Sequence, residues 1–240
     1  MSRYTHAMRR PPFDIIYEDR DILVVDKPAG LLTSTNPRER RPTLLAMVRD
    51  YIGQREPRAR VGLIHRLDKD ASGLLIFSKA HPAYDSLKTQ FFKHTVQRVY
   101  QAIVHGKPQP DRGRIESRLI EWKDGSVHST RVHAKGQRAI TDYEVVEQLK
   151  GYAIMRVTLL TGRKHQIRTQ LSERGWPILG DSVYGKENDN SPQLMLRAVR
   201  LEIEHPRTGK RMTFEAKPLK YEGVAVAKPK AETRQAKSQK

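Results

Sequence analysis

The sequence contains no cysteine, and this absence excludes several kinds of site at once. Disulfides, thiolate zinc sites, iron–sulfur clusters and a cysteine nucleophile all require that residue. A chain without cysteine suits a reducing compartment, and we expect a cytoplasmic protein. Nine histidines are present, but no H-E-x-x-H pattern or comparable cluster occurs, so we predict no metal site.

Long apolar runs and aromatic residues are also scarce. No stretch is apolar for the length needed to span a bilayer, and aromatic residues make up only 7% of the chain. Residues 1–10 are polar and basic with no apolar core after them, which does not match a secretory signal. Membrane binding therefore ranks well below nucleic-acid binding.

Acidic residues are few compared with basic ones. The chain has 45 Lys+Arg against 27 Asp+Glu, which leaves a formal charge of +18. Such a charge attracts polyanions and speeds their encounter with the protein. With 240 residues and 37% hydrophobic content, the chain is long enough to bury a substantial core. We expect a globular protein whose partner is nucleic acid.

The order of predicted elements indicates an α+β domain built on a mainly antiparallel sheet. Helical spacing and end signals predict helices from Thr43 through Ile52, at His81–Phe92 and at Lys164–Glu173. Short apolar or β-branched runs predict strands at Ile15–Tyr17, Ile22–Asp26, Gly73–Phe77, Val96–Val104, Ala139–Val146, Tyr152–Leu160, Leu196–Ile203 and Arg211–Ala216.

Composition divides the chain into three parts. Residues 1–12 form a basic N-terminal arm, residues 13–223 form the folded domain, and residues 224–240 form a basic tail. The tail is too polar to bury much surface, so we predict disorder there. A loop at Ser34–Arg41 carries three arginines, and contact with RNA and simple solvation are equally good interpretations of it.

Polar residues come directly before the apolar strand at Gly73–Phe77. Among them, Asp68 has Arg66 and Lys69 close in sequence. A carboxylate held among cations stays ionised and suits the work of a nucleophile or of stabilising a cation. Taken alone, these residues fit a structural ion pair or turn hydrogen bonds better.

Several motifs in one order favour a functional interpretation. His65–Asp68 followed by Ser72–Leu75 resembles the signature of the RluA family of pseudouridine synthases. The resemblance covers Phe13 to Leu219, with Ala71 and Lys164 as departures from the usual threonine or serine. Further similar motifs are Arg98–Gly106, Leu160–Arg168, Gly180–Gly185 and His205–Pro206. Several ordered motifs are far more specific than one.

The resemblance implies the fold, the partner and the cofactor requirement. We expect the pseudouridine synthase catalytic fold, a mainly antiparallel mixed sheet flanked by helices, with a central basic cleft. Residues 13–223 would be the catalytic domain of a short branch that lacks an S4-type RNA-binding domain. The expected substrate is ribosomal or transfer RNA. The reaction needs no cofactor, no protein partner is implied, and we expect a monomer.

The resemblance also implies the roles of three residues. Asp68 attacks the ribose anomeric carbon or assists by deprotonation, and the sequence does not choose between these routes. Arg168 pairs with Asp68 through a charge-assisted contact, with bidentate geometry as one option. Tyr100 stacks on the target base and helps with the proton at C5, although a core tyrosine in a strand is the simpler alternative.

Four further residues are expected to contact the substrate. A uridine in a stacked helix must flip into the pocket, and Arg66 would fill the gap that it leaves. His65, Arg163 and His165 complete the predicted substrate-binding set. Because histidines are as often packed hydrogen-bond donors as catalysts, we assign neither an acid nor a base role to the two histidines.

Parts of the sequence also fit three other functions. The segment Gly180–Lys186 has the glycine and lysine spacing of a phosphate-binding loop, but Glu187 replaces the required Ser/Thr, and we predict a turn. A non-catalytic RNA-binding protein is the main rival, and the presence of Asp68, Tyr100 and Arg168 together argues against it. Glycoside hydrolysis needs a second, neutral carboxylic acid, for which Asp70 is the nearest candidate.

Overall fold

The computed structural model describes residues 11, 13–35, 41–132, 135–187, 189 and 191–220. The predicted tail, the predicted N-terminal arm apart from Pro11 and most of the loop at residues 34–41 lie outside this part of the chain. The described residues form one sheet of 11 strands accompanied by three helices. This arrangement confirms the predicted α+β class.

The strands of the sheet include all eight that the sequence predicts. They are β1 (Asp14–Glu18), β2 (Ile22–Lys27), β3 (Gly62–Leu63), β4 (Ser72–Ser78), β5 (Gln97–His105), β6 (Arg112–Glu121), β7 (Val127–Ser129), β8 (Gln137–Gln148), β9 (Tyr152–Leu159), β10 (Leu196–Glu204) and β11 (Arg211–Glu215). Their order is β1-β2-β4-β10-β5-β9-β8-β6-β7, with β11 paired to β10 and β3 paired to β4. Only β4 and β10 pair in parallel, so the sheet is mixed and mainly antiparallel.

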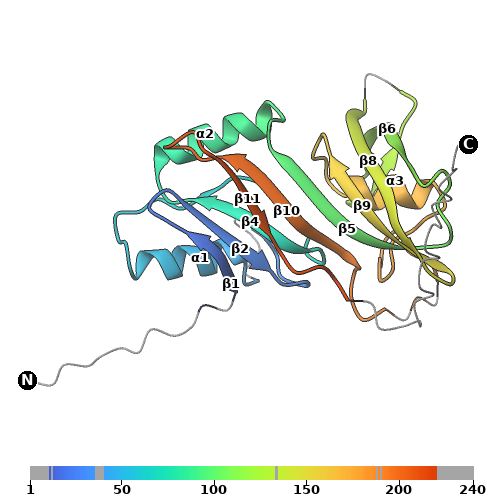
Figure 1. The fold of residues 1–240 in the computed structure, drawn as a ribbon, viewed down its shortest axis with the longest axis horizontal. Coiled ribbons are helices and arrows are strands. Elements are labelled where there is room, and N and C mark those ends of the chain that lie inside the picture. The colour runs from blue at the N-terminus through green and yellow to red at the C-terminus, as the bar shows by residue number, and fades with distance from the viewer. Residues whose placement is uncertain are drawn as a thin grey trace, which may run out of the picture.

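Three helices lie beside this sheet: α1 (Leu44–Gly53), α2 (His81–Phe92) and α3 (Gln166–Glu173). Figure 1 shows α1 and α2 beside the half with β1, β2 and β4, and α3 beside the half with β6 and β8. Helix α1 begins as predicted, because the side chain of Thr43 accepts a hydrogen bond from the N–H of Ala46. No helix in the described ranges is long and apolar enough to cross a membrane.

Helix α3 begins later than predicted. The expected start at Lys164 is wrong, and the first helical residue is Gln166. The cause is His165, whose backbone lies in the left-handed region with φ of 51° and cannot continue a right-handed helix. Gly175 has φ of 80° and lies just after the end of the helix, as predicted.

The apolar pattern does not predict strands β3, β6 and β7. Strand β6 buries only Ile115 and Leu119, and most of its remaining residues are polar or charged. Those two positions are four apart, a spacing that a strand and a helix share, so periodicity does not identify the element. Strand β6 forms because it pairs along its length with β8.

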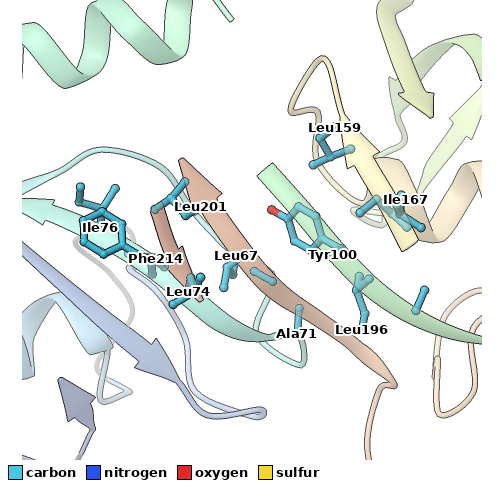
Figure 2. Close-up of a cluster of buried hydrophobic side chains, with 14 of the residues drawn as sticks. Leu67, Ala71, Leu74, Ile76, Tyr100, Leu159, Ile167, Leu196, Leu201 and Phe214 are labelled. Carbon is cyan, nitrogen blue, oxygen red and sulfur yellow. The ribbon is translucent and has the colours of Figure 1, made fainter. Parts of the chain in front are cut away.

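The main core extends along the sheet from one half to the other. The apolar residues Ile22–Val25 of β2 and Leu74–Phe77 of β4 are almost fully buried. Figure 2 shows part of the same cluster, from Phe214 and Ile76 to Leu159 and Ile167. Tyr100 of β5 belongs to it, so a predicted site residue is packed into the main core.

Candidate active site

Asp68 lies on a loop between β3 and β4 whose backbone is fastened on both sides. Thr33 Oγ1 donates to the carbonyl of Leu67 at 2.8 Å and accepts from the N–H of Leu67 at 3.3 Å. On the other side, Lys27 Nζ donates to the carbonyl of Lys69 at 2.8 Å. The residues before and after Asp68 are therefore held in place, which fixes where its carboxylate can reach.

Lys27 is a fully buried ammonium group at the end of β2. Besides Lys69, it donates to the carbonyls of Pro28 and Leu31, at 2.9 and 2.7 Å. Burial lowers the pKa of Lys27 to about 8, although the nearby charges of Asp70 and Asp68 act in the opposite direction. Three carbonyl acceptors thus replace water around this cation, and sequence reasoning gave Lys27 no role.

Asp68 contacts a buried arginine, as predicted, and it does so through a single nitrogen. Arg168 Nη1 donates to Asp68 Oδ2 at 3.3 Å. The bidentate contact is made instead with Asp181, which accepts from Nε and Nη2 of Arg168, both at 2.8 Å. The predicted pairing of Asp68 with Arg168 is therefore present as a single contact, and the bidentate option is not the one that forms. The Asp181 carboxylate accepts hydrogen bonds from Nε and Nη2 of the guanidinium, which leaves Nη1 to bond with Asp68.

Asp181 is itself held by the turn that the motif analysis predicts in place of a phosphate-binding loop. Its Oδ1 accepts from the backbone N–H groups of Val183 and Tyr184, both at 3.0 Å. Burial alone would raise the pKa of Asp181, but Arg168 and these N–H groups lower it below its ordinary value. The turn is tight, because a Cβ on Gly185 would lie 2.1 Å from the carbonyl oxygen of Asp181. Asp181 is a buried partner of Arg168 that the motif contained but to which sequence reasoning assigned no role.

Arg168 gains its position from a helix that is polar yet buried. Gln166 and Gln170 of α3 are almost fully buried, and both hydrogen-bond to Thr141 of β8. These bonds fix α3 against the sheet, so that Arg168 points at Asp68 and Asp181. Burial alone would lower the pKa of Arg168, but its bonds with the two carboxylates raise it well above its ordinary value. Arg168 is therefore a permanent cation.

Tyr100 lies on β5 and lines the same cleft as Asp68. Its side chain is 94% covered, and Leu67 and Leu196 belong to the same packed cluster (Figure 2). Burial raises the pKa of Tyr100, Arg98 lowers it, Asp68 raises it, and the net effect is an increase. The phenol is therefore protonated at neutral pH, so it is a hydrogen-bond donor in the free protein.

The cleft around these residues has a volume of about 770 Å³ and collects every predicted site residue. Its charged lining is mostly cationic, as the predicted basic cleft requires. The two carboxylates that line it are Asp68 and Glu121, and Glu121 forms a salt bridge with Lys164 at 2.6 Å. Asp70, the carboxylic acid considered for glycoside hydrolysis, does not line it. The predicted residues that line it are His65, Arg66, Asp68, Tyr100, Arg163, His165 and Arg168.

The two histidines of the cleft are held by neighbouring groups. His65 Nε2 accepts from the N–H of Ile76 at 3.3 Å, and its ring stacks on Phe91 with centroids 4.7 Å apart. Burial, with Arg98 and Lys88 adding to it, lowers the pKa of His65 to about 3, so the ring stays neutral. His165 Nδ1 bonds to the hydroxyl of Tyr184 at 2.8 Å. Packing and hydrogen bonds therefore fix the orientation of both rings in the cleft.

Three arginines supply positive charge without a carboxylate partner in the described ranges. Arg66 is exposed, and Arg163 donates through Nε to the carbonyl of Arg138 at 3.1 Å. Arg98 is less exposed, and its buried Nε has no acceptor among the described residues. Its guanidinium lies against Gly162, where a Cβ would meet Nη1 at 2.5 Å. Sequence reasoning quoted Arg98 in a motif but did not predict this unpaired cation.

One group of residues outside the cleft has the composition of a metal site. Asp19, Asp21 and His205 bring their ligand atoms within 4.8 Å of one another. Their atoms are already engaged, because His205 Nε2 bonds to Asp19 at 2.8 Å and Arg207 donates two hydrogen bonds to Asp21. This network joins the β1–β2 turn to the β10–β11 turn, and we assign it a structural role.

Comparison with known proteins identifies the family. Residues 21–173 match the family model described as RNA pseudouridylate synthase. An uncharacterized RNA pseudouridine synthase, YlyB of Bacillus subtilis, is 38% identical over 85% of this chain and 68% of its own length. The dual-specificity RNA pseudouridine synthase RluA of Haemophilus influenzae is 36% identical over 86% of this chain and 94% of its own.

Solved structures agree with the sequence comparison. Human RNA pseudouridylate synthase domain containing 4 superposes with a TM-score of 0.72 and 22% identity, over 86% of this chain and 88% of its own, which supports the fold. Human RNA pseudouridylate synthase domain containing 1 gives a TM-score of 0.70 at 25% identity, over 86% of this chain and 84% of its own. The chain therefore belongs to the RNA pseudouridylate synthase family, and it is an RNA-modifying isomerase that converts uridine to pseudouridine.

Proposed function

We propose that Asp68 is the catalytic carboxylate of this isomerase, that Arg168 orients it and that Tyr100 contacts the target base. The observation that carries this proposal is the chain of contacts from Asp68 to Arg168 to Asp181 inside a basic cleft that Tyr100 also lines. A carboxylate fastened beside a permanent cation is oriented before substrate arrives. Its geometry therefore costs no reorganisation during the reaction.

The isomerisation breaks one bond to the ribose and forms another. The bond from C1′ to N1 of uracil breaks, the base turns, and C1′ joins C5, which then loses its hydrogen while N1 gains one. Departure of the base builds positive charge on the sugar, and an anionic oxygen from Asp68 stabilises that charge. Two routes fit the geometry, attack of Asp68 on C1′ and deprotonation of the ribose by Asp68.

Tyr100 serves the base rather than the sugar in this proposal. Its ring provides a flat apolar face for uracil, and its hydroxyl is near enough to Asp68 for their charges to interact. Because burial raises its pKa, the phenol donates a hydrogen bond to the departing base more readily than it accepts a proton. Tyr100 could accept the C5 proton only after its phenol had first given its own proton away.

The exposed cations of the cleft would hold the RNA around the flipped nucleotide. Arg66 lies two residues before Asp68 and is exposed, so it can enter the space that the flipped uridine leaves. Arg163, His65 and His165 line the same cleft, where we propose contacts to the phosphates and to the ribose. These contacts position the RNA but do not read its sequence.

For the substrate class, we propose structured ribosomal RNA, with transfer RNA as the second possibility. The proposal draws on two relatives: a ribosomal large subunit pseudouridine synthase D from Zymomonas mobilis, 35% identical over 85% of this chain and 69% of its own length, and the dual-specificity enzyme described above. We also propose that residues 13–223 are the catalytic domain, that residues 1–12 and 224–240 add non-specific affinity, and that the enzyme acts as a cytoplasmic monomer.

Tritium release from RNA labelled at uridine C5 tests this proposal. The protein would be incubated with ribosomal and transfer RNA transcripts that contain no pseudouridine. Release from ribosomal RNA alone, or from both RNAs, supports the proposed substrate class, and release from transfer RNA alone overturns it. Tight binding of both RNAs without release from either would indicate a binding protein or another substrate.

A further inference from the structure

An exposed aromatic ring lies at the end of α2. Phe92, the last residue of that helix, is 84% exposed. The preceding residue, Phe91, is packed: it stacks on His65 and lies 5.6 Å from the guanidinium of Arg98. Phe92 therefore has no role in the core that would explain a ring at this position, and an exposed ring of this size costs solubility.

The position of Phe92 relative to the active site is specific. It lines the same cleft as Asp68 and Tyr100. In Figure 1, the end of α2 leads directly into β5, the strand that carries Tyr100. The helix ends here because His94 adopts a left-handed backbone with φ of 56°, which leaves Phe92 at the margin of the cleft.

Most of the charged groups that line this cleft together with Phe92 are cationic. Lys88, Arg98 and Arg163 line the same cleft, and none of the three forms a salt bridge within the described ranges. His94 lines the cleft with them, and burial together with Arg98 and Arg163 lowers its pKa, so its ring is neutral at neutral pH. An exposed aromatic ring in a mainly cationic cleft matches the way proteins bind single-stranded nucleic acid, with phosphates on the cations and a base on the ring.

The proposed reaction creates a base that such a ring can hold. When a uridine leaves the stack for the pocket, the nucleotide next to it loses a stacking partner and exposes one face. Stacking of that face on an aromatic side chain recovers part of the lost free energy, whatever the identity of the base. A ring at the margin of the pocket is in the right place to do this.

We propose that Phe92 forms a stacking subsite for an unpaired base of the RNA next to the target uridine. The location beside the target rests on the proposed function, whereas the stacking itself does not. Phe92 is a positioning residue: it holds the RNA strand so that the uridine enters the cleft, and it touches none of the reacting atoms.

Binding of an oligouridylate strand, measured by fluorescence anisotropy, tests the stacking. Phe92→Leu keeps an apolar side chain without a flat ring, Phe92→Trp keeps the ring, and Val146→Ala alters another exposed apolar residue, one that does not line the cleft. Phe92→Leu should bind about 5- to 150-fold more weakly than the parent. Phe92→Trp and Val146→Ala should bind like the parent.

An abasic strand of the same length separates stacking from charge. The parent and Phe92→Leu should bind it equally, because only phosphates and sugars remain to be recognised. Equal binding of the oligouridylate by these two proteins would overturn the proposal, and so would an equal loss on both strands. Equal binding is also the result expected if Phe92 serves a protein partner instead.

The location beside the target is tested by kinetics on the RNA that releases tritium. Phe92→Leu should lower kcat/KM about as much as it weakens binding, while its melting temperature stays that of the parent. An unchanged kcat/KM would place the stacking away from the target nucleotide, and it would overturn the proposed location of the subsite beside the target uridine. If no RNA releases tritium, the proposed function fails, and the binding comparison still decides whether Phe92 stacks on a base.

Discussion

Arg168 gives two forked hydrogen bonds to Asp181, both at 2.8 Å, and a single contact to Asp68 at 3.3 Å. The stronger interaction, between Arg168 and Asp181, is therefore buried beneath the cleft surface, where the Asp181 side chain is 99% covered. The weaker interaction faces the cleft, where the Asp68 side chain is 24% exposed. Asp181 anchors the arginine, and the arginine in turn orients Asp68 without holding it rigidly.

Replacing Asp181 with asparagine should therefore reduce activity although the residue does not line the cleft. The amide cannot accept both forked bonds, so Arg168 shifts and Asp68 loses its orientation. We expect kcat to fall roughly 10- to 100-fold, as for displacements of about 1 Å in other sites. The free energy of unfolding should fall by about 3 kcal/mol, because a buried cation loses its main partner.

Single-turnover rates and urea unfolding would measure these two effects. Asp142→Asn is a matched control, because Asp142 pairs with Arg114 on an exposed part of the sheet. Its free energy of unfolding should change by less than about 1 kcal/mol. Full activity of Asp181→Asn would show that Arg168 does not depend on this anchor.

Lys27 should matter for stability, with a characteristic dependence on pH. The change Lys27→Met leaves three carbonyls without a donor, which should cost about 2 to 4 kcal/mol at neutral pH. The pKa of Lys27 is about 8 in the folded protein, against an ordinary value of 10.5. Between these values the unfolded chain binds more protons, so stability from this group rises with pH.

The stability advantage of the parent over Lys27→Met should therefore grow from pH 8 to pH 10. Urea unfolding of both proteins across this range would measure it. Taking the difference between the two proteins removes the contribution of tyrosines, which titrate in the same range. A constant difference would mean that Lys27 is not perturbed by burial.

His65 should make the stability of the protein depend on pH in the acidic range, whereas Lys27 acts in the alkaline range. Its pKa is about 3 in the folded protein and 6.5 when unperturbed, so the unfolded chain binds the proton first as pH falls. The parent should lose roughly 2 to 3 kcal/mol relative to His65→Gln between pH 7 and pH 4.5. Urea unfolding at the two pH values measures the change, and no change would mean that the ring is solvated.

Tyr100→Phe tests whether the phenol takes part in proton transfer. The substitution keeps the ring that stacks on the base and removes only the hydroxyl. We expect RNA binding to be unchanged and the single-turnover rate to fall at least about 10²-fold, which is typical of a lost acid or base. A rate equal to that of the parent would limit Tyr100 to stacking and packing.

The sequence predicts the members of the site better than their connections. The motifs identify Asp68, Tyr100 and Arg168, and all three reach one cleft although Asp68 and Arg168 are 100 residues apart. Arg168 makes its bidentate contact with Asp181 rather than with Asp68. This choice depends on the packing of α3 against β8 and on a tight turn at Asp181. These are three-dimensional relations that motif order does not contain.

The same limit applies to Lys27 and Phe92. A lysine at the end of an apolar strand predicts an exposed charge, because lysines are almost never fully buried. Only the fold shows that three carbonyls surround the ammonium group of Lys27. In α2, Ala83 and Leu87 are buried four residues apart and Phe91 continues that spacing, so the sequence places Phe92 off the packed face. Only the fold shows that this exposed ring lines the cleft of Asp68 and Tyr100.

The most direct test of the central claim is tritium release by Asp68→Asn. This change keeps the size of the side chain and removes its negative charge. With the RNA that the parent modifies, the parent should release tritium in step with pseudouridine formation. The variant should be at least about 10³-fold slower while still binding that RNA. Release at the parental rate by Asp68→Asn would contradict the assignment of Asp68 as the catalytic carboxylate.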